Sequence, residues 1–221
     1  MGKTTAIEAV VKIFIMQLLV FFAIVGLAYA VKRVEHPTEL PIPPWANETK
    51  YGRYQDAWKS LNQNSTTRYW LVSATFNDDG ASWGSDFQCL SVQETNLSET
   101  NKSVVSVFKF LNASNPTQVH TVEEQVEAVF MYNYTQKPNG IQYTLKNGTK
   151  LNDTVIFSNK NCDILSVPYM NNGNGCELWV RDEHVDKVPT CCLFIYEFFC
   201  TKNVTTYNIY KNNCKNLTIL N

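Results

Sequence analysis

Apolar and polar residues alternate in short runs through most of the chain after residue 67. In 68–76, Trp70, Val72, Ala74 and Phe76 fall on one face of an extended chain, a period of two that indicates a half-buried strand. Runs of similar character predict seven further strands, at 86–93, 103–111, 122–134, 141–145, 154–158, 162–167 and 176–180. Because turn residues separate the runs, the pattern predicts an all-β fold, an eight-stranded up-and-down antiparallel barrel.

Two helices are expected beside the strands. Residues 54–61 predict a short helix before the barrel, with Trp58 and Leu61 on one side. Pro189 can start a second helix over 190–202, which is apolar nearly all round and should pack on the barrel wall. The tail at 207–214 is expected to be extended. Residues 31–50 contain four prolines and no periodicity, which predicts an extended N-terminal arm before a barrel domain at 51–221.

The first thirty residues have the features of a secretory signal peptide. Lys3 and Lys12 supply positive charge, the run 13–28 is apolar, and residues 28–30 form an A-x-A cleavage site. This run is short for a membrane anchor, and no later stretch is long and apolar enough to span a bilayer. The mature protein is therefore expected to begin near Val31, and to be secreted and extracellular with no membrane segment.

The cysteines and sequons fit an extracellular protein. Seven cysteines follow the signal, and in this compartment they predict disulfides with at least one thiol left over. Zinc is disfavoured because no C-x-x-C pair occurs and histidines are few, so no metal site is expected. Ten glycosylation sequons predict a heavily glycosylated surface. They begin at Asn47, Asn64, Asn96, Asn101, Asn112, Asn133, Asn147, Asn152, Asn203 and Asn216.

Charge and motif content exclude several classes of function. Without Lys3, Lys12 and Glu8 the mature chain has 17 basic residues (19 minus 2) and 19 acidic ones (20 minus 1), with no basic stripe for nucleic acid. Neither His120 nor His184 has an obvious nucleophile and orienting partner, and no Gly-rich phosphate loop occurs. We expect no catalytic residues, no cofactor and no enzymatic activity.

Acidic residues within apolar, strand-forming segments carry the most informative chemistry. Asp163 begins one predicted strand, Glu177 lies within another, and Glu124 rather than Glu123 falls on the apolar face of a third. Removing a carboxylate from water costs several kcal/mol unless a partner offsets the loss. A small organic cation that also stacks on aromatic rings is such a partner, so the pattern predicts an amine-binding site.

Four segments carry a resemblance to a known family, together with the cysteine-bearing C-terminal helix. They are 55–61 (QDAWKSL), 83–89 (WGSDFQC), 162–164 (CDI) and 177–179 (ELW). These motifs resemble the tick salivary lipocalins, and most closely their histamine-binding proteins. The resemblance implies an eight-stranded barrel with a flanking C-terminal helix, secreted into the bite wound, where it sequesters host histamine or serotonin and suppresses inflammation.

The resemblance also implies a set of ligand-binding residues. They are Phe76, Asp78 or Asp79, Trp83, Glu124, Tyr143, Asp153, Asp163, Glu177 and Trp179. Phe76 stands where the amine binders carry a tyrosine, so one hydroxyl is lost. Leu151 replaces a pocket phenylalanine, and Asn64 replaces an acid that serves a second amine site. Turn formation alone explains Asp78-Asp79-Gly80 equally well.

Disulfide pairing is implied by the same resemblance. The expected bridges are Cys89–Cys214, Cys162–Cys192 and Cys176–Cys200, which leave Cys191 unpaired. A monomer is expected, with a Cys191-linked dimer as the alternative.

Two other functions remain open. The barrel could hold a lipid, such as a leukotriene, fatty acid or sterol, because Phe76 and Leu151 make its interior less polar. Alternatively, the loops could inhibit a host immune protein.

Overall fold

The computed structural model describes residues 42–217. The predicted signal peptide and the first part of the arm lie outside these residues. Pro43 onward forms one compact unit. Within the described residues, no helix has the length and hydropathy needed to cross a membrane.

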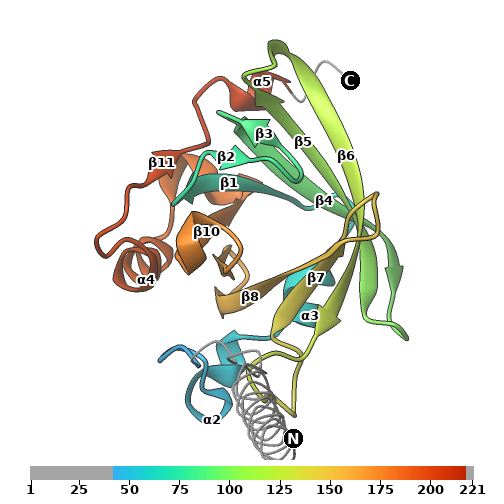
Figure 1. The fold of residues 1–221 in the computed structure, drawn as a ribbon, viewed down its shortest axis with the longest axis vertical. Helices are drawn as coiled ribbons and strands as arrows, with labels where there is room; N and C mark the ends of the chain where they lie inside the picture. Colours follow the sequence, from blue (N-terminus) through green and yellow to red (C-terminus); the bar gives the residue numbers. More distant parts are fainter. Residues whose placement is uncertain (1–41, 218–221) are drawn as a thin grey trace, which may run out of the picture. The chain divides into compact units, whose positions relative to one another are not determined.

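Eight antiparallel strands close into a barrel (Figure 1), which confirms the predicted fold class. Each strand pairs with the next along the chain, and β10 returns to pair with β1. The strands are β1 (Arg68–Ala74), β4 (Gln88–Ser98), β5 (Ser103–Asn112), β6 (Asn115–Val129), β7 (Gly140–Thr144), β8 (Lys150–Ser158), β9 (Cys162–Val167) and β10 (Gly175–Arg181).

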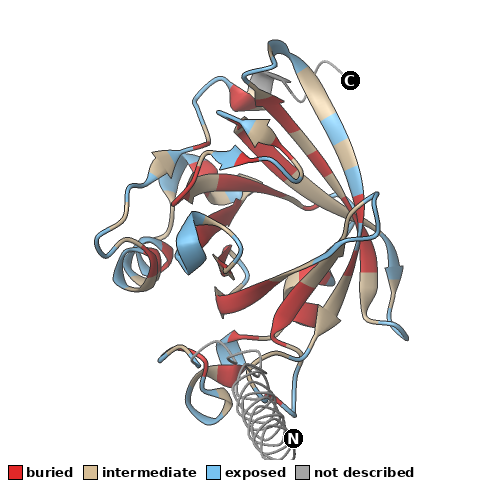
Figure 2. Cartoon of the chain, in the orientation of Figure 1, coloured by how far each residue is buried: buried red, intermediate tan, exposed pale blue. Residues whose placement is uncertain are grey.

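Successive side chains of β10 point to opposite faces of the barrel wall and belong to two different apolar clusters. Trp179 joins Leu71, Phe108 and other side chains of one cluster, whereas Leu178 packs in another with Cys192 and Tyr196 of the C-terminal helix. Buried residues follow the strands, and many loop residues are exposed (Figure 2). Glu177 lies two residues before Trp179, so both side chains are on the inner face of β10.

Short elements cover both ends of the barrel. Strands β2 (Asp78–Asp79) and β3 (Gly84–Ser85) pair at one end, so Asp78 and Asp79 form a strand where a simple turn was expected. Helix α3 (Ala57–Leu61) lies toward the other end (Figure 1) and is capped by Asp56, whose carboxylate accepts the Lys59 N–H at 3.1 Å. It is shorter than the predicted helix because η1 (Gly52–Tyr54) precedes it.

The expected extended arm ends before residue 50. Helix α2 (Glu48–Tyr51) begins at residue 48 and is capped by the side chain of Asn47. The Glu48 carboxylate accepts N–H groups of Gln136 at 2.8 Å and Thr135 at 2.9 Å, and Trp45 is buried edge-on against Tyr132. These contacts hold the segment against the end of the barrel, a tertiary effect that proline content does not reveal.

Three disulfides attach the C-terminal segments, in the pairs that the resemblance implies. Cys162–Cys192 and Cys176–Cys200 fix helix α4 (Thr190–Cys200) to β9 and β10. Cys89–Cys214 ties β4 to α5 (Cys214–Leu217), which begins at the last residue of the tail predicted to be extended. Before it, β11 (Tyr207–Asn208) extends the sheet beside β1. Cys191 is exposed and unpaired.

A buried amide joins the N-terminal segment to the barrel. The Gln55 side chain is 1% exposed, donates to the carbonyl oxygens of Trp45 and Ile156, and accepts the Tyr134 hydroxyl. Gln55→Ala is expected to lower the free energy of unfolding by about 2–4 kcal/mol, because it leaves buried polar groups unsatisfied. Urea unfolding measures this effect. Exposed Gln118→Ala should change stability by less than about 0.5 kcal/mol, and an equally small effect at Gln55 would refute the prediction.

Candidate functional site

Four carboxyl groups gather inside the barrel, and we term them the acid cluster. Asp79 comes from β2, Glu124 from β6, Asp153 from β8 and Glu177 from β10. They are between 2% and 6% exposed. The charges of Asp79 and Asp153 act on Glu177, and those of Asp79 and Glu124 act on Asp153, so the four groups share one environment.

Hydrogen bonds satisfy this cluster only in part. The Ser82 hydroxyl donates to Glu124 Oε1 at 3.1 Å, and Trp179 Nε1–H donates to Glu177 Oε2 at 2.7 Å. Asp79 Oδ1 accepts backbone N–H groups, whereas Asp153 Oδ1 is buried without a hydrogen-bond partner. Within residues 42–217, no basic side chain forms an ion pair with any of the four carboxyls.

Burial raises the pKa of every carboxyl in the cluster. It raises the pKa of Asp153 to about 8, despite the opposing effect of the Tyr169 and Tyr143 hydroxyls, and the pKa of Glu177 well above its usual range. The pKa values of Asp79 and Glu124 are raised by burial too. Mutual repulsion adds to these shifts. Part of the cluster is therefore protonated at neutral pH, and a cation bound there would favour ionisation.

Aromatic rings form a wall beside the acids. Trp83 lies 5.2 Å from Phe87, 5.7 Å from Phe108 and 6.5 Å from Trp179, measured between ring centroids. Phe76 packs on Phe87 at 5.9 Å. The indole N–H of Trp83 is buried with no hydrogen-bond partner. The wall thus offers flat faces and one unused donor to a ligand with a flat ring.

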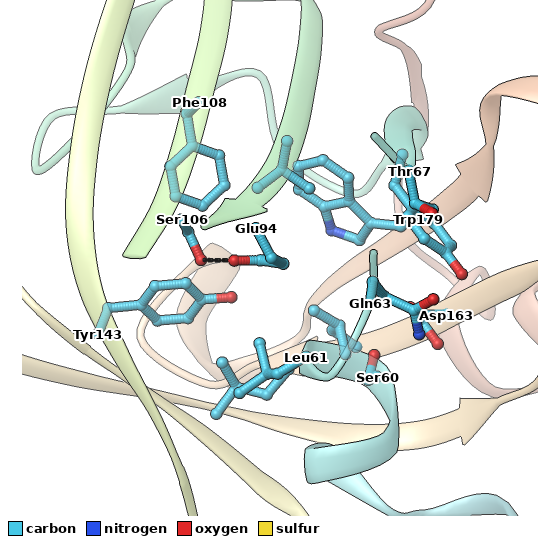
Figure 3. Close-up of a pocket in the computed structure, with 14 residues that line it drawn as sticks. Ser60, Leu61, Gln63, Thr67, Glu94, Ser106, Phe108, Tyr143, Asp163 and Trp179 are labelled. Carbon is cyan, nitrogen blue, oxygen red and sulfur yellow. Dashed lines mark hydrogen bonds between the residues drawn. The ribbon is translucent and has the colours of Figure 1, made fainter. Parts of the chain in front are cut away.

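A separate cavity lies on the α3 side of Trp179, and we term it the α3 chamber (Figure 3). Glu94 of β4 and Asp163 of β9 both line it, as do Ser60, Ser106 and Tyr143 among others. Its volume is about 40 Å³, which is space for roughly three water molecules. Trp179 borders the chamber and also hydrogen-bonds Glu177, so its indole lies between the two groups of acids.

The chamber acids resemble the acid cluster in having no cationic partner. The Ser106 hydroxyl donates to Glu94 Oε2 at 2.7 Å, and Asp163 Oδ1 is buried without a partner. Burial raises the pKa of Glu94 to about 7 and that of Asp163 to about 6. No ion pair involves either group among the described residues.

The site residues expected from sequence fall into three positions. Six of them, Asp79, Glu124, Tyr143, Asp153, Glu177 and Trp179, come together at or beside the acid cluster, with Trp83 in the adjoining wall. Asp163 lies apart, in the α3 chamber. The structure distinguishes the two adjacent acids of β2, because Asp79 is buried and Asp78 is exposed. Phe76 contacts the wall through Phe87.

Sequence reasoning missed Glu94, which lines the α3 chamber. Leu90, Val92 and Glu94 alternate along β4, so the period of two could have identified Glu94, but the predicted strand stops at residue 93. No group of three or more His, Cys, Asp or Glu side chains is arranged for a metal ion in the described part of the chain.

Comparison with known proteins identifies the family. The model of the tick histamine-binding protein family matches residues 45–216. The chain belongs to the tick histamine-binding protein family. The male-specific histamine-binding salivary protein of Rhipicephalus appendiculatus is 36% identical over 181 residues, covering 78% of this chain and 88% of the relative. The female-specific histamine-binding protein 1 of the same tick is 34% identical over 173 residues, with the same coverage of both chains.

Histamine-binding proteins of this family are non-enzymatic binding proteins, which confirms that the chain is not an enzyme. Among solved structures, the AM182 serotonin complex is similar to this chain with a TM-score of 0.51 and 23% identity, covering 72% of this chain and 92% of AM182. That likeness supports the lipocalin barrel. The motifs that suggested the histamine-binding family therefore identified it correctly.

Proposed function

We propose that this protein is a secreted salivary lipocalin that sequesters histamine or serotonin in the acid cluster. The observation that carries the proposal is four buried carboxyl groups with no basic partner in the described residues. Two relatives named for histamine binding and the salivary origin of one of them support it. Three disulfides are consistent with secretion. Capture is stoichiometric, and removal of the free host amine would suppress inflammation.

The chemistry of both amines matches the cluster. Each carries an ammonium group at neutral pH, which would pair with one ionised carboxyl of the Asp153–Glu177 pair, and a flat ring, which would stack on Trp83 or Trp179. Cation–π contact adds about 0.5–2 kcal/mol per contact. The unpartnered Trp83 N–H can donate to an imidazole nitrogen or to a hydroxyl on the ring.

Calorimetry of the secreted, glycosylated protein with histamine and then serotonin tests the proposal. We expect sub-micromolar affinity for at least one amine. Absence of heat with both, on folded and ligand-free protein, would refute it. A lipid is the competing ligand, suggested by Phe76 and Leu151, but a hydrocarbon chain would leave the burial cost of four carboxyls without compensation. Organic extraction and mass spectrometry would detect a retained lipid.

The α3 chamber provides a second, weaker position for an amine in this proposal. Glu94 and Asp163 supply the charge, and the small cavity has to widen around the ligand, which lowers affinity. We expect a weak second binding step in calorimetry. Glu94→Gln should weaken that step about tenfold and leave the first step within twofold, whereas Glu99→Gln, at the exposed β4–β5 turn, should change neither. A two-step isotherm unchanged by Glu94→Gln would exclude this role for Glu94.

A further inference from the structure

Another cavity lies beside the acid cluster, and we term it the Glu124 cavity. Its volume is about 300 Å³, at the lower end of the range for small-molecule sites. The β2–β3 connection lines it with Ala81 and Ser82, the β7–β8 turn with Leu145, Lys146 and Asn147, and β6 with Val122 and Glu124.

The strand order explains why the two connections meet. Neighbouring strands are antiparallel, so the link from β1 to β4, which carries β2 and β3, lies at the same end of the barrel as the β7–β8 turn. Helix α3 lies toward the other end (Figure 1). On that side the indole of Trp179 separates the α3 chamber from the acids, so a ligand in the chamber would have to displace this ring to reach them.

The Glu124 cavity leads from the surface to one acid of the cluster. Ala81, Lys146 and Asn147 are exposed, whereas Glu124 is 6% exposed. Among the side chains that line the cavity, only Glu124 and Lys146 are charged. A cation inside the cavity is repelled by the exposed Lys146 and attracted by the buried Glu124, so these charges favour its movement inward.

One rim of the cavity is a tight turn, and the other is attached to the acid cluster. Two backbone hydrogen bonds of 2.8 and 2.9 Å close the β7–β8 turn. On the other side, the Ser82 hydroxyl donates to Glu124 Oε1 at 3.1 Å. Asp79 Oδ1 accepts the backbone N–H groups of Ala81 at 2.9 Å and Ser82 at 3.2 Å. Two acids of the cluster therefore hold the β2–β3 connection beside the cavity.

We propose that the Glu124 cavity is the entrance through which a small amine reaches the acid cluster, with Glu124 as the first ionic contact. The apolar side chains of Val122 and Leu145 suit the ring of the amine, and the carboxyl of Glu124 suits its ammonium group. This inference rests on the proposed function and adds a route to the site. It separates rim residues such as Ala81, which control the rate of capture, from the buried acids, which determine affinity.

A larger side chain at the rim tests the route. Because Ala81→Phe obstructs the path and not the site, it should slow association and dissociation of the preferred amine about tenfold and leave the equilibrium affinity within about twofold. Stopped-flow tryptophan fluorescence measures both rates. Ala113→Phe is the matched control, since Ala113 is exposed in the β5–β6 connection at the same end of the barrel and does not line the cavity. Wild-type rates in Ala81→Phe would overturn the proposed entrance.

A second measurement needs no amine binding and separates this inference from the proposed function. Cys191→Ser removes the exposed free thiol, and Glu124→Cys in that background places a thiol at the buried end of the cavity. Aminoethyl methanethiosulfonate, a small cationic reagent, should convert this thiol to a mixed disulfide and release methanesulfinate, which mass spectrometry follows. Adding Ala81→Phe should slow the reaction about tenfold, and adding Ala113→Phe should not change it.

The outcomes of the labelling experiment are distinct. Equal labelling rates with and without Ala81→Phe, or no labelling of the folded protein, would overturn the entrance even if the wild type binds amine. Slower labelling with Ala81→Phe, in a protein whose wild type binds neither amine, would support the route and reject the proposed function.

Discussion

Glu177→Gln is expected to weaken amine binding about 100-fold or more and leave the stability of the ligand-free protein unchanged or higher. The carboxyl is 2% exposed, and its pKa is raised well above the usual range by burial and by the charge of Asp153. Burial therefore favours its protonated form in the ligand-free protein, and glutamine imitates that form in shape and in its hydrogen bond from Trp179. Glutamine cannot ionise when the ammonium arrives, and removing one partner of a buried charge pair costs about 2–5 kcal/mol.

The combination of lost affinity and retained stability is the distinguishing result. Calorimetry gives the affinity, and thermal unfolding of the same ligand-free sample gives the stability. A structural acid would show the opposite, with reduced stability and little direct effect on binding. Such a result for Glu177→Gln would contradict the assignment of the acid cluster as the binding site.

Asp78 and Asp79 form a natural matched pair for the same experiment. They are adjacent in β2, but Asp79 is buried in the cluster and Asp78 is exposed. Asp79→Asn should weaken binding, whereas Asp78→Asn should leave it within about twofold, since exposed single charges contribute little. Equal effects from both substitutions would mean that net charge near the barrel end, rather than contact in the cluster, governs affinity.

Local patterns were sufficient to predict the barrel. Alternation in 68–76 and in the seven later runs located all eight strands, because burial of one face imposes a period of two. The helix after Pro189 was predicted to pack on the barrel wall because it is apolar nearly all round. In the structure, α4 buries Cys192, Tyr196 and Cys200. The positions of such elements follow from the burial of apolar side chains, which the sequence pattern shows directly.

The details of the site depend on contacts that sequence spacing does not contain. Asp78 and Asp79 could not be separated, because their direction is set by pairing of β2 with β3. Similarly, residues 48–50 were expected to be extended, and they lie in helix α2 because Glu48 accepts backbone N–H groups 87 to 89 residues away.

Amine binding is expected to release about one proton at pH 7 and to strengthen as the pH rises from about 5.5 to 8. Burial raises the pKa of Asp153 to about 8, and that of Glu177 well above its usual range. Asp153 is therefore largely protonated in the ligand-free protein at pH 7, and burial favours the protonated form of Glu177 as well. The ammonium group stays charged to about pH 10, the usual range of an alkylamine. Its arrival stabilises one carboxylate, and the displaced proton enters the buffer.

Stability of the ligand-free protein should change with pH in the opposite direction. When unfolding exposes these carboxyls, their pKa values return to the ordinary range near 4, so between about pH 4 and 8 the folded state binds more protons than the unfolded state. The free energy of unfolding therefore falls as the pH rises through this range, as far as these groups determine it. Glu94, with a pKa of about 7, and Asp163, with a pKa of about 6, contribute in the same direction.

Calorimetry in phosphate and in Tris at the same pH counts the released protons, because the two buffers differ in heat of protonation. For the wild type, the observed binding enthalpies should differ by about the difference between the protonation enthalpies of the two buffers, which corresponds to one released proton. The Asp153→Asn/Glu177→Gln double variant should show little buffer dependence in any binding that remains. Equal enthalpies for the wild type in both buffers would mean that the carboxyls are already ionised before the amine arrives. The affinity could then not be attributed to buried carboxyls that lack a cationic partner until the amine binds. An affinity that rises with pH while ligand-free stability falls would establish that the same carboxyls oppose folding in their charged form and favour capture of the cation.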